Sequence, residues 1–241
     1  MRLIDFVVVG VQKAGTTALH DYLSNDPAYG MAIAKEAHFF DDDSLNWKSP
    51  AYESYHAQFD WNRSLIRGEA TPIYIYWPNC LERMAAYNPD MKIVVMLRDP
   101  VERAWSHWKM EAARGVESHD FSWCIREGRR RLQCRIPWGV DREISYVERG
   151  FYGEQLERLF GVFPPSQVLI IEADDLKQRP ADPLARLNAF LGAPSPAATD
   201  RRSVHVGPAS SASLSKHDIA LMRELYAEDN ARLHALTGIS Y

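Results

Sequence analysis

A lysine and two threonines follow a short apolar run near the amino terminus of the chain. The run, Phe6–Val9, leads into a glycine-containing loop that holds Lys13, and Thr16 and Thr17 come directly after the loop. When such a turn leads into a helix, backbone N–H groups and the positive end of the helix dipole converge on one point. The pattern therefore predicts a phosphate site, to which Lys13 adds a positive charge and the threonines add hydroxyl donors.

This loop differs from the Walker A loop of ATP and GTP hydrolases. In that motif two glycines with four residues between them are followed at once by Lys and then Ser or Thr. Gly10 and Gly15 have this separation, but Thr16 follows Gly15 and Lys13 lies inside the loop. We therefore predict a nucleotide phosphate site of another kind. A plain strand-to-helix turn with an incidental lysine is the alternative that the loop alone leaves open.

A carboxylate and an imidazole stand two positions apart in the segment KEAHFFDDD. If the backbone is extended there, Glu36 and His38 point to the same side and share a cleft. Either group is able to take a proton from a hydroxyl. A polar surface loop anchored by Phe39 and Phe40 is an equally weighted alternative.

A second strand, polar turn and helix repeat the pattern of the first. The apolar run Lys92–Leu97 leads into Arg98 and a helix predicted over 101–114. Because ligands bind at the carboxyl ends of the strands in open α/β sheets, we expect Arg98 beside the first loop. Ser106, two turns into the helix, would join Arg98 at a second phosphate. For these two residues alone, a surface serine and a structural arginine–aspartate pair are the alternative.

The remaining pattern predicts a single α/β domain over residues 1–241, with a central parallel sheet flanked by helices in a P-loop-like nucleotide-binding fold. Gly150 and Gly153 are potential breaks in the helix over 144–160, and Gly192 is expected to end the helix over 183–191. The strand over 65–71 would deliver Glu69 and Thr71 to the edge of the site. The other predicted elements are helices over 16–24, 78–87, 121–131 and 215–236, an extended segment over 30–34 and a strand over 167–171.

Composition restricts the partners of this chain. Its 241 residues are 46% hydrophobic, which is enough for one sizeable α/β core. A formal net charge of −4 disfavours binding to nucleic acid or to anionic membranes, because such proteins usually carry a basic excess. The basic run Arg129–Arg131 is interpreted as a solvated helix face, and the border of an anionic substrate is its alternative.

The cysteine and apolar patterns indicate a cellular location. Cys80, Cys124 and Cys134 are odd in number and lack C-x-x-C spacing, which favours reduced thiols over disulfides or a zinc site. The apolar run at the amino terminus leads directly into the phosphate loop without a small-residue cleavage site, so we expect a core strand and no signal peptide. No later apolar run approaches the length of a membrane span. We therefore expect a cytoplasmic protein with no nucleic-acid and no membrane partner.

Taken together, these motifs resemble the PAPS-dependent sulfotransferases. The segment VGVQKAGTTAL resembles their 5′-phosphosulfate loop, which has an internal lysine, and LRDPVERAWSHW resembles their 3′-phosphate motif. Between them, KEAHFFDD and GEATPIY resemble the branch that contains the heparan sulfate and related Golgi-type sulfotransferases with many bacterial relatives. The four motifs occur in the expected order, and the resemblance extends through FYGEQLERLFGVFPPSQVLIIEADDL to cover most of the chain.

The resemblance implies a role for each matching residue. Lys13 would contact the leaving phosphosulfate bridge, Glu36 would be the catalytic base, and His38 would be the neighbouring active-site histidine and the alternate base. Arg98 and Ser106 would bind the 3′-phosphate. The full set of cofactor-binding residues implied is Gln12, Lys13, Ala14, Gly15, Thr16, Thr17, Arg98, Ser106 and Tyr152.

The implied reaction is transfer of a sulfuryl group from PAPS to a hydroxyl of a small metabolite or saccharide, with release of PAP and no metal. In-line transfer needs a deprotonated acceptor oxygen and stabilisation of the charge on the departing phosphate, which agrees with these residue types. A nucleotide-dependent phosphotransferase is the alternative, and it predicts a Mg²⁺ site and a lysine directly after Gly15. A nucleotide-binding regulatory protein is the non-enzymatic alternative.

Two segments limit the resemblance. Heparan sulfate enzymes typically carry Lys in the segment corresponding to GEATP, where this chain has Ala70, which weakens the expectation of a polyanionic saccharide substrate. In relatives a loop corresponding to residues 201–213 closes over the nucleotide. Arg201, Arg202 and Ser210 are therefore candidates there, and a plain flexible linker is an equal alternative.

Overall fold

The computed structural model describes residues 2–63, 65–194 and 213–241. Arg201, Arg202 and Ser210 lie outside these ranges. The described residues form two compact units, each assembled from separated stretches of the chain. Unit 1 comprises residues 2–97 and 160–194, and unit 2 comprises residues 98–159 and 213–241. The single domain predicted over 1–241 stays a prediction.

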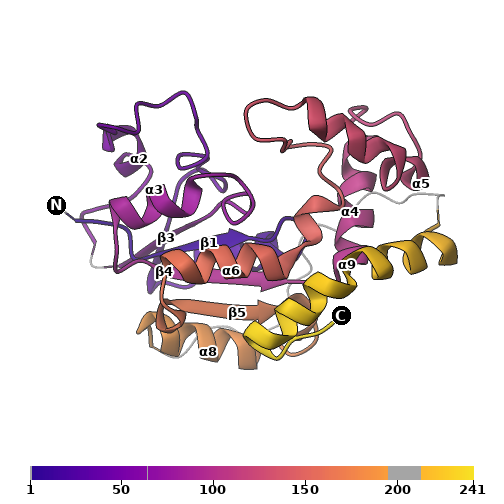
Figure 1. Cartoon of the computed structure of the whole chain (residues 1–241). Coiled ribbons are helices and arrows are strands. Elements are labelled where there is room, and N and C mark those ends of the chain that lie inside the picture. The colour runs from indigo at the N-terminus through magenta and orange to yellow at the C-terminus, as the bar shows by residue number, and fades with distance from the viewer. Residues whose placement is uncertain (1, 64, 195–212) are drawn as a thin grey trace. The chain divides into compact units, whose positions relative to one another are not determined.

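Unit 1 contains a five-stranded sheet in the order β2-β3-β1-β4-β5, in which every neighbouring pair is parallel (Figure 1). All five residues of β1 are buried, as expected for a strand with helices on both faces of its sheet. The predicted α/β class with a central parallel sheet is confirmed. The strands are β1 (Phe6–Gly10), β2 (Tyr29–Met31), β3 (Ile66–Ala70), β4 (Lys92–Leu97) and β5 (Val168–Glu172).

The register aligns the carboxyl ends of the three central strands. Phe6 of β1 pairs with Gly68 of β3 and with Lys92 of β4. The loop after β1 is tied to β4 directly, because the Val11 N–H donates to the Met96 carbonyl at 2.8 Å. In parallel sheets this edge is where ligands bind, so the chain enters its polar loops where chemistry is expected.

The helices of unit 1 begin and end close to the predicted positions. The helix predicted over 183–191 begins at Ala181, and Gly192 ends it with a φ of 80°, a left-handed conformation that suits glycine. The helices of unit 1 are α1 (Thr16–Ser24), α2 (Glu53–His56), α3 (Cys80–Tyr87), α7 (Ala173–Gln178) and α8 (Ala181–Leu191).

Unit 2 is helical and has its own apolar core. Its helices are α4 (Pro100–Ala113), α5 (Phe121–Cys124) and α9 (Lys216–Thr237), and α6 (Tyr152–Val162) begins in this unit. Short 3₁₀ segments span Glu127–Cys134 and Glu148–Gly150. The core cluster includes Val101, Trp108, Phe121, Tyr146, Met222 and Tyr226.

Two predicted helices in unit 2 were wrong over part of their length. The helix over 121–131 ends at Cys124 and gives way to a 3₁₀ segment, where Gly128 packs so closely that a Cβ on it would lie 2.9 Å from Trp123. The helix over 144–160 begins only at Tyr152. Residues 144–147 are all buried, whereas a surface helix would bury one face only.

The contact between β1 and β3 yields a stability prediction. A Cβ on Gly68 would lie 2.3 Å from Cε1 of the buried Phe6 ring. We expect Gly68→Ala to destabilise the protein by about 1–3 kcal/mol through overpacking, measured as a lower urea midpoint. Gly161→Ala is the matched control, because nothing lies within 4 Å of a Cβ on this helical glycine and alanine favours helix. An unchanged midpoint in Gly68→Ala would contradict this account.

Candidate active site

The loop between β1 and α1, residues 11–15, has the backbone of an anion site. Lys13 and Gly15 both adopt positive φ angles, 72° and 84°. Gly15 is the N-cap residue of α1, and within the described chain no side chain caps that helix. The positive end of the helix dipole is thus left without a side-chain acceptor of the described chain, which suits an anion.

The predicted loop residues differ in what they present. Ala14 is fully buried and its N–H donates to the Val11 carbonyl at 3.1 Å, so this residue holds the turn. Gln12, Lys13 and Thr17 are half-buried, and Thr16 is buried. Backbone hydrogen bonds therefore maintain the shape of the loop, and Lys13, Thr16 and Thr17 are carried on it.

Lys35, Glu36, His38 and Asp41 form one cluster of charges in unit 1, here called the Glu36–His38 cluster. The His38 Nε2 lies 3.3 Å from Glu36 Oε2, and its Nδ1 lies 2.9 Å from Asp41 Oδ2. Lys35 Nζ donates to Glu36 Oε1 at 2.9 Å. Glu36 and His38 do meet, but through a bent backbone with a positive φ at His38 and not through the extended backbone on which their shared side was made conditional.

Sequence reasoning missed Asp41. Its carboxylate is buried and lies three residues after His38, within the acidic run of KEAHFFDDD. The spacing alone did not distinguish it from Asp42 and Asp43, because a bent backbone decides which of the three acids reaches the imidazole. Asp41 fixes the orientation of the His38 ring.

The hydrogen bonds of the cluster shift its protonation in opposite directions. The hydrogen bond to Asp41, followed by the one to Glu36, raises the pKa of His38 to about 9 despite partial burial. Burial raises the pKa of Glu36, but the hydrogen bonds from His38 and Lys35 outweigh burial and lower that pKa to about 2. At neutral pH Glu36 is therefore a carboxylate and His38 an imidazolium.

A second, buried carboxylate holds the backbone of the Glu36–His38 cluster in place. Glu69, at the end of β3, accepts hydrogen bonds from Thr71 at 2.5 Å, Tyr55 at 2.7 Å and Tyr74 at 3.1 Å. The Thr71 hydroxyl also accepts from the Ala37 N–H, and the Tyr74 hydroxyl accepts from the Phe39 N–H. Both neighbours of His38 are thus tied to one buried network, in which burial raises the pKa of Glu69. Glu69 and Thr71 therefore support the Glu36–His38 cluster through hydrogen bonds to the backbone beside His38.

In unit 2, Arg98 and Ser106 lie along one face of α4. Arg98 pairs with Glu102 at 2.9 Å, and Ser106 lies one turn beyond Glu102 on the same face. Asp99 is the N-cap, and its Oδ1 accepts from the N–H groups of Val101 at 2.9 Å and Glu102 at 3.0 Å. An anion bound by Arg98 would have to replace its contact with Glu102.

Tyr152, at the start of α6, is buried, and its hydroxyl donates to the Arg98 carbonyl at 2.9 Å. Burial also raises its pKa. The hydroxyl therefore fixes the backbone of Arg98, and the predicted role of Tyr152 in binding the nucleotide stays a prediction. The predicted residues form two sets in two units: residues 12–17, 36 and 38 in unit 1, and residues 98, 106 and 152 in unit 2.

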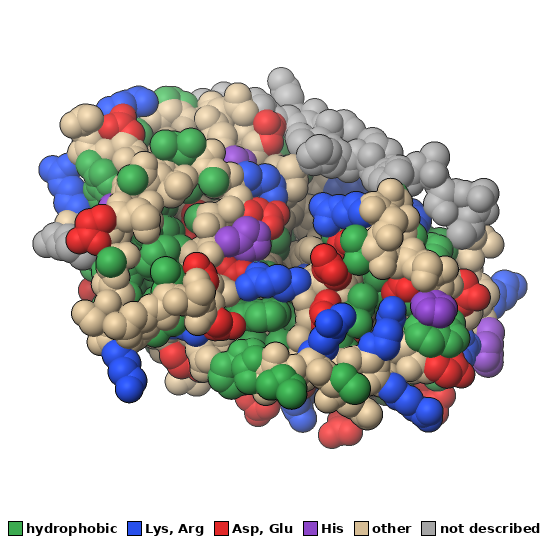
Figure 2. Space-filling model, turned by 90° about the horizontal axis from the view of Figure 1, so that it is seen from above, with side chains coloured by type: hydrophobic (Ala, Val, Ile, Leu, Met, Phe, Trp, Pro, Cys, Tyr) green, Lys and Arg blue, Asp and Glu red, His purple; other side chains and the backbone are tan. Residues whose placement is uncertain are grey.

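An aromatic side chain of unit 1 and the basic run of unit 2 have structural contacts. Trp47 packs against Phe39 at 5.5 Å and under Arg83 at 4.4 Å, as an anchor of a long loop would. In the basic run, Arg129 pairs with Glu148 at 2.8 Å and Arg131 with Glu117 at 2.7 Å. Figure 2 shows acidic and basic side chains interspersed over the face that it presents.

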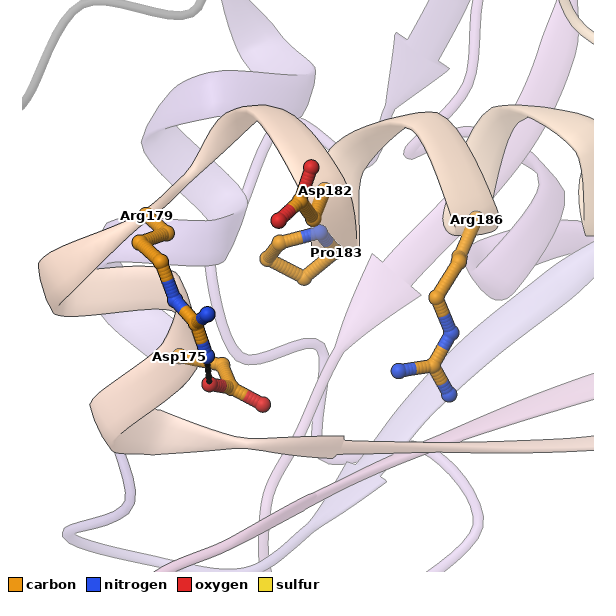
Figure 3. A pocket seen from close by; sticks show the side chains of 5 residues that line it. All are labelled: Asp175, Arg179, Asp182, Pro183 and Arg186. Atoms are coloured by element: carbon orange, nitrogen blue, oxygen red, sulfur yellow. Dashed lines mark hydrogen bonds and ion pairs between the residues drawn. The ribbon is translucent and has the colours of Figure 1, made fainter.

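A surface pocket of unit 1 contains none of the predicted residues. It is formed by α7 and α8, where Arg179 pairs with Asp175 at 2.8 Å (Figure 3). Its other lining residues are Asp182, Pro183 and Arg186. In the described ranges, no group of three His, Cys, Asp or Glu residues is arranged to hold a metal ion. No helix among the described residues is long and apolar enough to cross a membrane.

Comparisons with known proteins add a family and several relatives. Residues 3–210 match the family model described as the sulfotransferase domain. Mouse heparan sulfate glucosamine 3-O-sulfotransferase 3B1 is 31% identical over 199 residues, which cover 79% of this chain and 46% of that protein. Human bifunctional heparan sulfate N-deacetylase/N-sulfotransferase 2 is 28% identical, over 79% of this chain and 22% of its own length. The chain thus spans less than half the length of these two curated relatives.

Solved structures with the same fold include a sulfotransferase from Alicyclobacillus acidocaldarius. It is 27% identical, covers 100% of this chain and 98% of its own, and has a TM-score of 0.83. The sulfotransferase domain from the curacin biosynthetic pathway has a TM-score of 0.53 at 17% identity, over 80% of this chain and 76% of its own. Mouse sulfotransferase SULT7A1, solved in complex with PAP, has a TM-score of 0.50 at 15% identity, over 93% and 64%.

The charge state of the Glu36–His38 cluster is testable by NMR. We expect the His38 ring to titrate near pH 9, because Asp41 and Glu36 accept hydrogen bonds from the imidazolium and raise its pKa. Asp41→Asn removes the larger contribution and should lower that pKa toward the ordinary value of 6.5. Ring signals are assigned with His38→Gln and followed against pH.

Asp42→Asn is the matched control for this titration. Asp42 belongs to the same acidic run but accepts hydrogen bonds from the Ser44 N–H and hydroxyl instead. The pKa of His38 should stay near 9 in this variant. A wild-type His38 with a pKa near 6.5, or equal effects of the two substitutions, would contradict the geometry of the cluster.

Proposed function

This chain belongs to the sulfotransferase domain family, as its motifs predicted, and on that premise we propose that it transfers a sulfuryl group from PAPS to an acceptor hydroxyl. The observation that carries the proposal is the loop after β1, where Lys13 stands before an α1 N-terminus without a side-chain cap in the described chain. This arrangement suits a 5′-phosphosulfate, because N–H groups at the start of the helix would bind the phosphate. Lys13 lies before Gly15 and not directly after it, as the lysine of the Walker A loop does.

The proposed donor is PAPS and the proposed product PAP. A neighbour of the same fold, mouse SULT7A1, was solved with PAP, which supports this choice. Arg98 and Ser106 would bind the 3′-phosphate from one face of α4, and Arg98 would exchange Glu102 for that phosphate. A guanidinium is well matched to phosphate, since it forms charge-assisted, bidentate hydrogen bonds.

We assign the base to Glu36. The acceptor O–H proton passes to the Glu36 carboxylate as the acceptor oxygen bonds to sulfur, and the bond from sulfur to the bridging phosphate oxygen breaks. PAP departs with that electron pair, and Lys13 and the N–H groups of the loop stabilise its charge. His38 is the weaker candidate, because its raised pKa of about 9 leaves it protonated at neutral pH. As an imidazolium between two carboxylates, it orients Glu36.

The proposed acceptor is a saccharide or another small molecule with a hydroxyl. The curated relatives named above are heparan sulfate enzymes, which supports a saccharide. Ala70 is buried at the end of β3 and supplies no positive charge there, which disfavours a highly sulfated acceptor. We also propose a cytoplasmic location, which the three free cysteines support.

Nucleotide binding tests the donor. We expect calorimetric titration to show tighter binding of PAP than of ADP, because ADP lacks the 3′-phosphate. Arg98→Ala should weaken PAP binding by about 10- to 100-fold, the usual cost of losing a hydrogen bond to a charged group. Arg114→Ala, which removes an exposed arginine from the end of α4, should leave binding unchanged. Equal affinities for PAP and ADP, insensitive to Arg98→Ala, would return the case to a phosphotransferase or a nucleotide sensor.

Turnover tests the base. With PAPS and a panel of monosaccharides, phenols and alcohols, we expect Glu36→Gln to lower kcat by about 100-fold or more while PAP binding is retained. The glutamine keeps the shape of the side chain but accepts no proton. His38→Gln should cause a smaller loss, since this variant keeps the Glu36 carboxylate. Full activity in Glu36→Gln beside an inactive His38→Gln would assign the base to His38.

A further inference from the structure

We propose that one face of α9, carrying Arg223, Tyr226 and Asp229, positions Arg98 to read the 3′-phosphate of the nucleotide. This inference rests on the proposed function. The three residues are spaced at intervals of three along the helix, and each contacts another segment of unit 2. Helix α9 lies beyond residue 210, where the match to the family model ends.

The first contact is made with the residue that follows Arg98. Arg223 Nη2 donates to Oδ2 of Asp99. The other oxygen of that carboxylate is the N-cap of α4, where it accepts from the N–H groups of Val101 and Glu102. One carboxylate therefore joins α9 to the first turn of α4, and the Arg98 backbone enters that turn in a fixed direction.

The second contact is made through α6. The carboxylate of Asp229 accepts from the N–H groups of Gly153 and Glu154, each at 2.8 Å, and so caps α6 from a different helix. The preceding residue, Tyr152, donates its hydroxyl to the Arg98 carbonyl at 2.9 Å. Asp229 thus holds the start of α6, and α6 in turn holds the Arg98 backbone through Tyr152.

Close packing makes this arrangement specific. A Cβ on Gly153 would lie 2.5 Å from the Asp229 carbonyl oxygen, and one on Gly150 would lie 2.3 Å from the Tyr226 hydroxyl. Tyr226 is buried and donates to the Val147 carbonyl at 2.8 Å. The two glycines let α9 approach closely enough for its side chains to reach the start of α6.

The contacts around Arg98 should affect the binding of nucleotides that carry a 3′-phosphate and not of those that lack it. Arg98 follows the last residue of β4 and is bound on both sides: its carbonyl by Tyr152, and the next residue by Arg223. Loss of the Arg223 contact would leave the guanidinium present but less well oriented. Affinity for a 3′-phosphate should fall, whereas affinity for a nucleotide without that group should not.

The experiment compares PAP with 5′-AMP, which differs only in lacking the 3′-phosphate. We expect calorimetry to show Arg223→Gln weakening PAP binding about tenfold, within the range of coupling between contacting residues, with 5′-AMP unaffected. Arg223→Lys, which keeps the charge, should restore part of the loss. In an Arg98→Ala background, Arg223→Gln should have no further effect on PAP, because the group it positions is gone.

Arg179→Gln is the matched control. Arg179 is an exposed arginine of unit 1 that pairs with Asp175 at 2.8 Å, so its loss removes a surface ion pair without touching α9. Equal losses in the two variants, or parallel losses for PAP and 5′-AMP, would overturn the positioning role and leave the proposed function standing. Wild-type protein that binds PAP no more tightly than 5′-AMP would overturn the reading of the 3′-phosphate and, with it, both proposals.

Discussion

The parallel pairing of β1 with β3 on one side and β4 on the other is the constraint on which the rest of this protein depends. It brings three carboxyl ends to one edge of the sheet, so that the chain leaves for the phosphate loop, for Thr71 and for Arg98 from neighbouring strands. Most residues of each strand are buried, and β1 and β4 contribute apolar side chains to the core. Chemistry is left to the loops, where polar groups retain access to ligands.

Buried and half-buried carboxylates do much of the positioning within each unit. In unit 1, Glu69 accepts from the Thr71 and Tyr74 hydroxyls, which bind the backbone on the two sides of His38, and Asp41 orients the imidazole. In unit 2, Asp99 and Asp229 cap α4 and α6. The hydrogen bonds that each carboxylate accepts offset the cost of its partial or full burial, and they fix a segment that carries a candidate functional residue.

Hydrogen bonds to carboxylates also set the protonation states of the residues in the Glu36–His38 cluster. A neutral histidine at this place would compete with the carboxylate for the proton of an acceptor. The two hydrogen bonds to His38 hold it in the charged form and leave Glu36 ionised, so the cluster divides the roles between its members. This division is a property of the bent backbone at residues 33–38, which places the imidazole between two acids.

Local pattern was enough for the strands of the sheet, for α1 and α4, and for the motifs after β1 and β4, because apolar runs and turn residues act over a few positions. It was also enough to identify the family. It failed for the first part of the helix over 144–160, where residues 144–147 are all buried and non-helical, and it did not distinguish Asp41 from its acidic neighbours. Contacts between distant residues, such as Asp229 with the start of α6, arise only when the chain is folded. A helical period or a loop motif depends on neighbouring residues only, so it gives no information about such distant contacts.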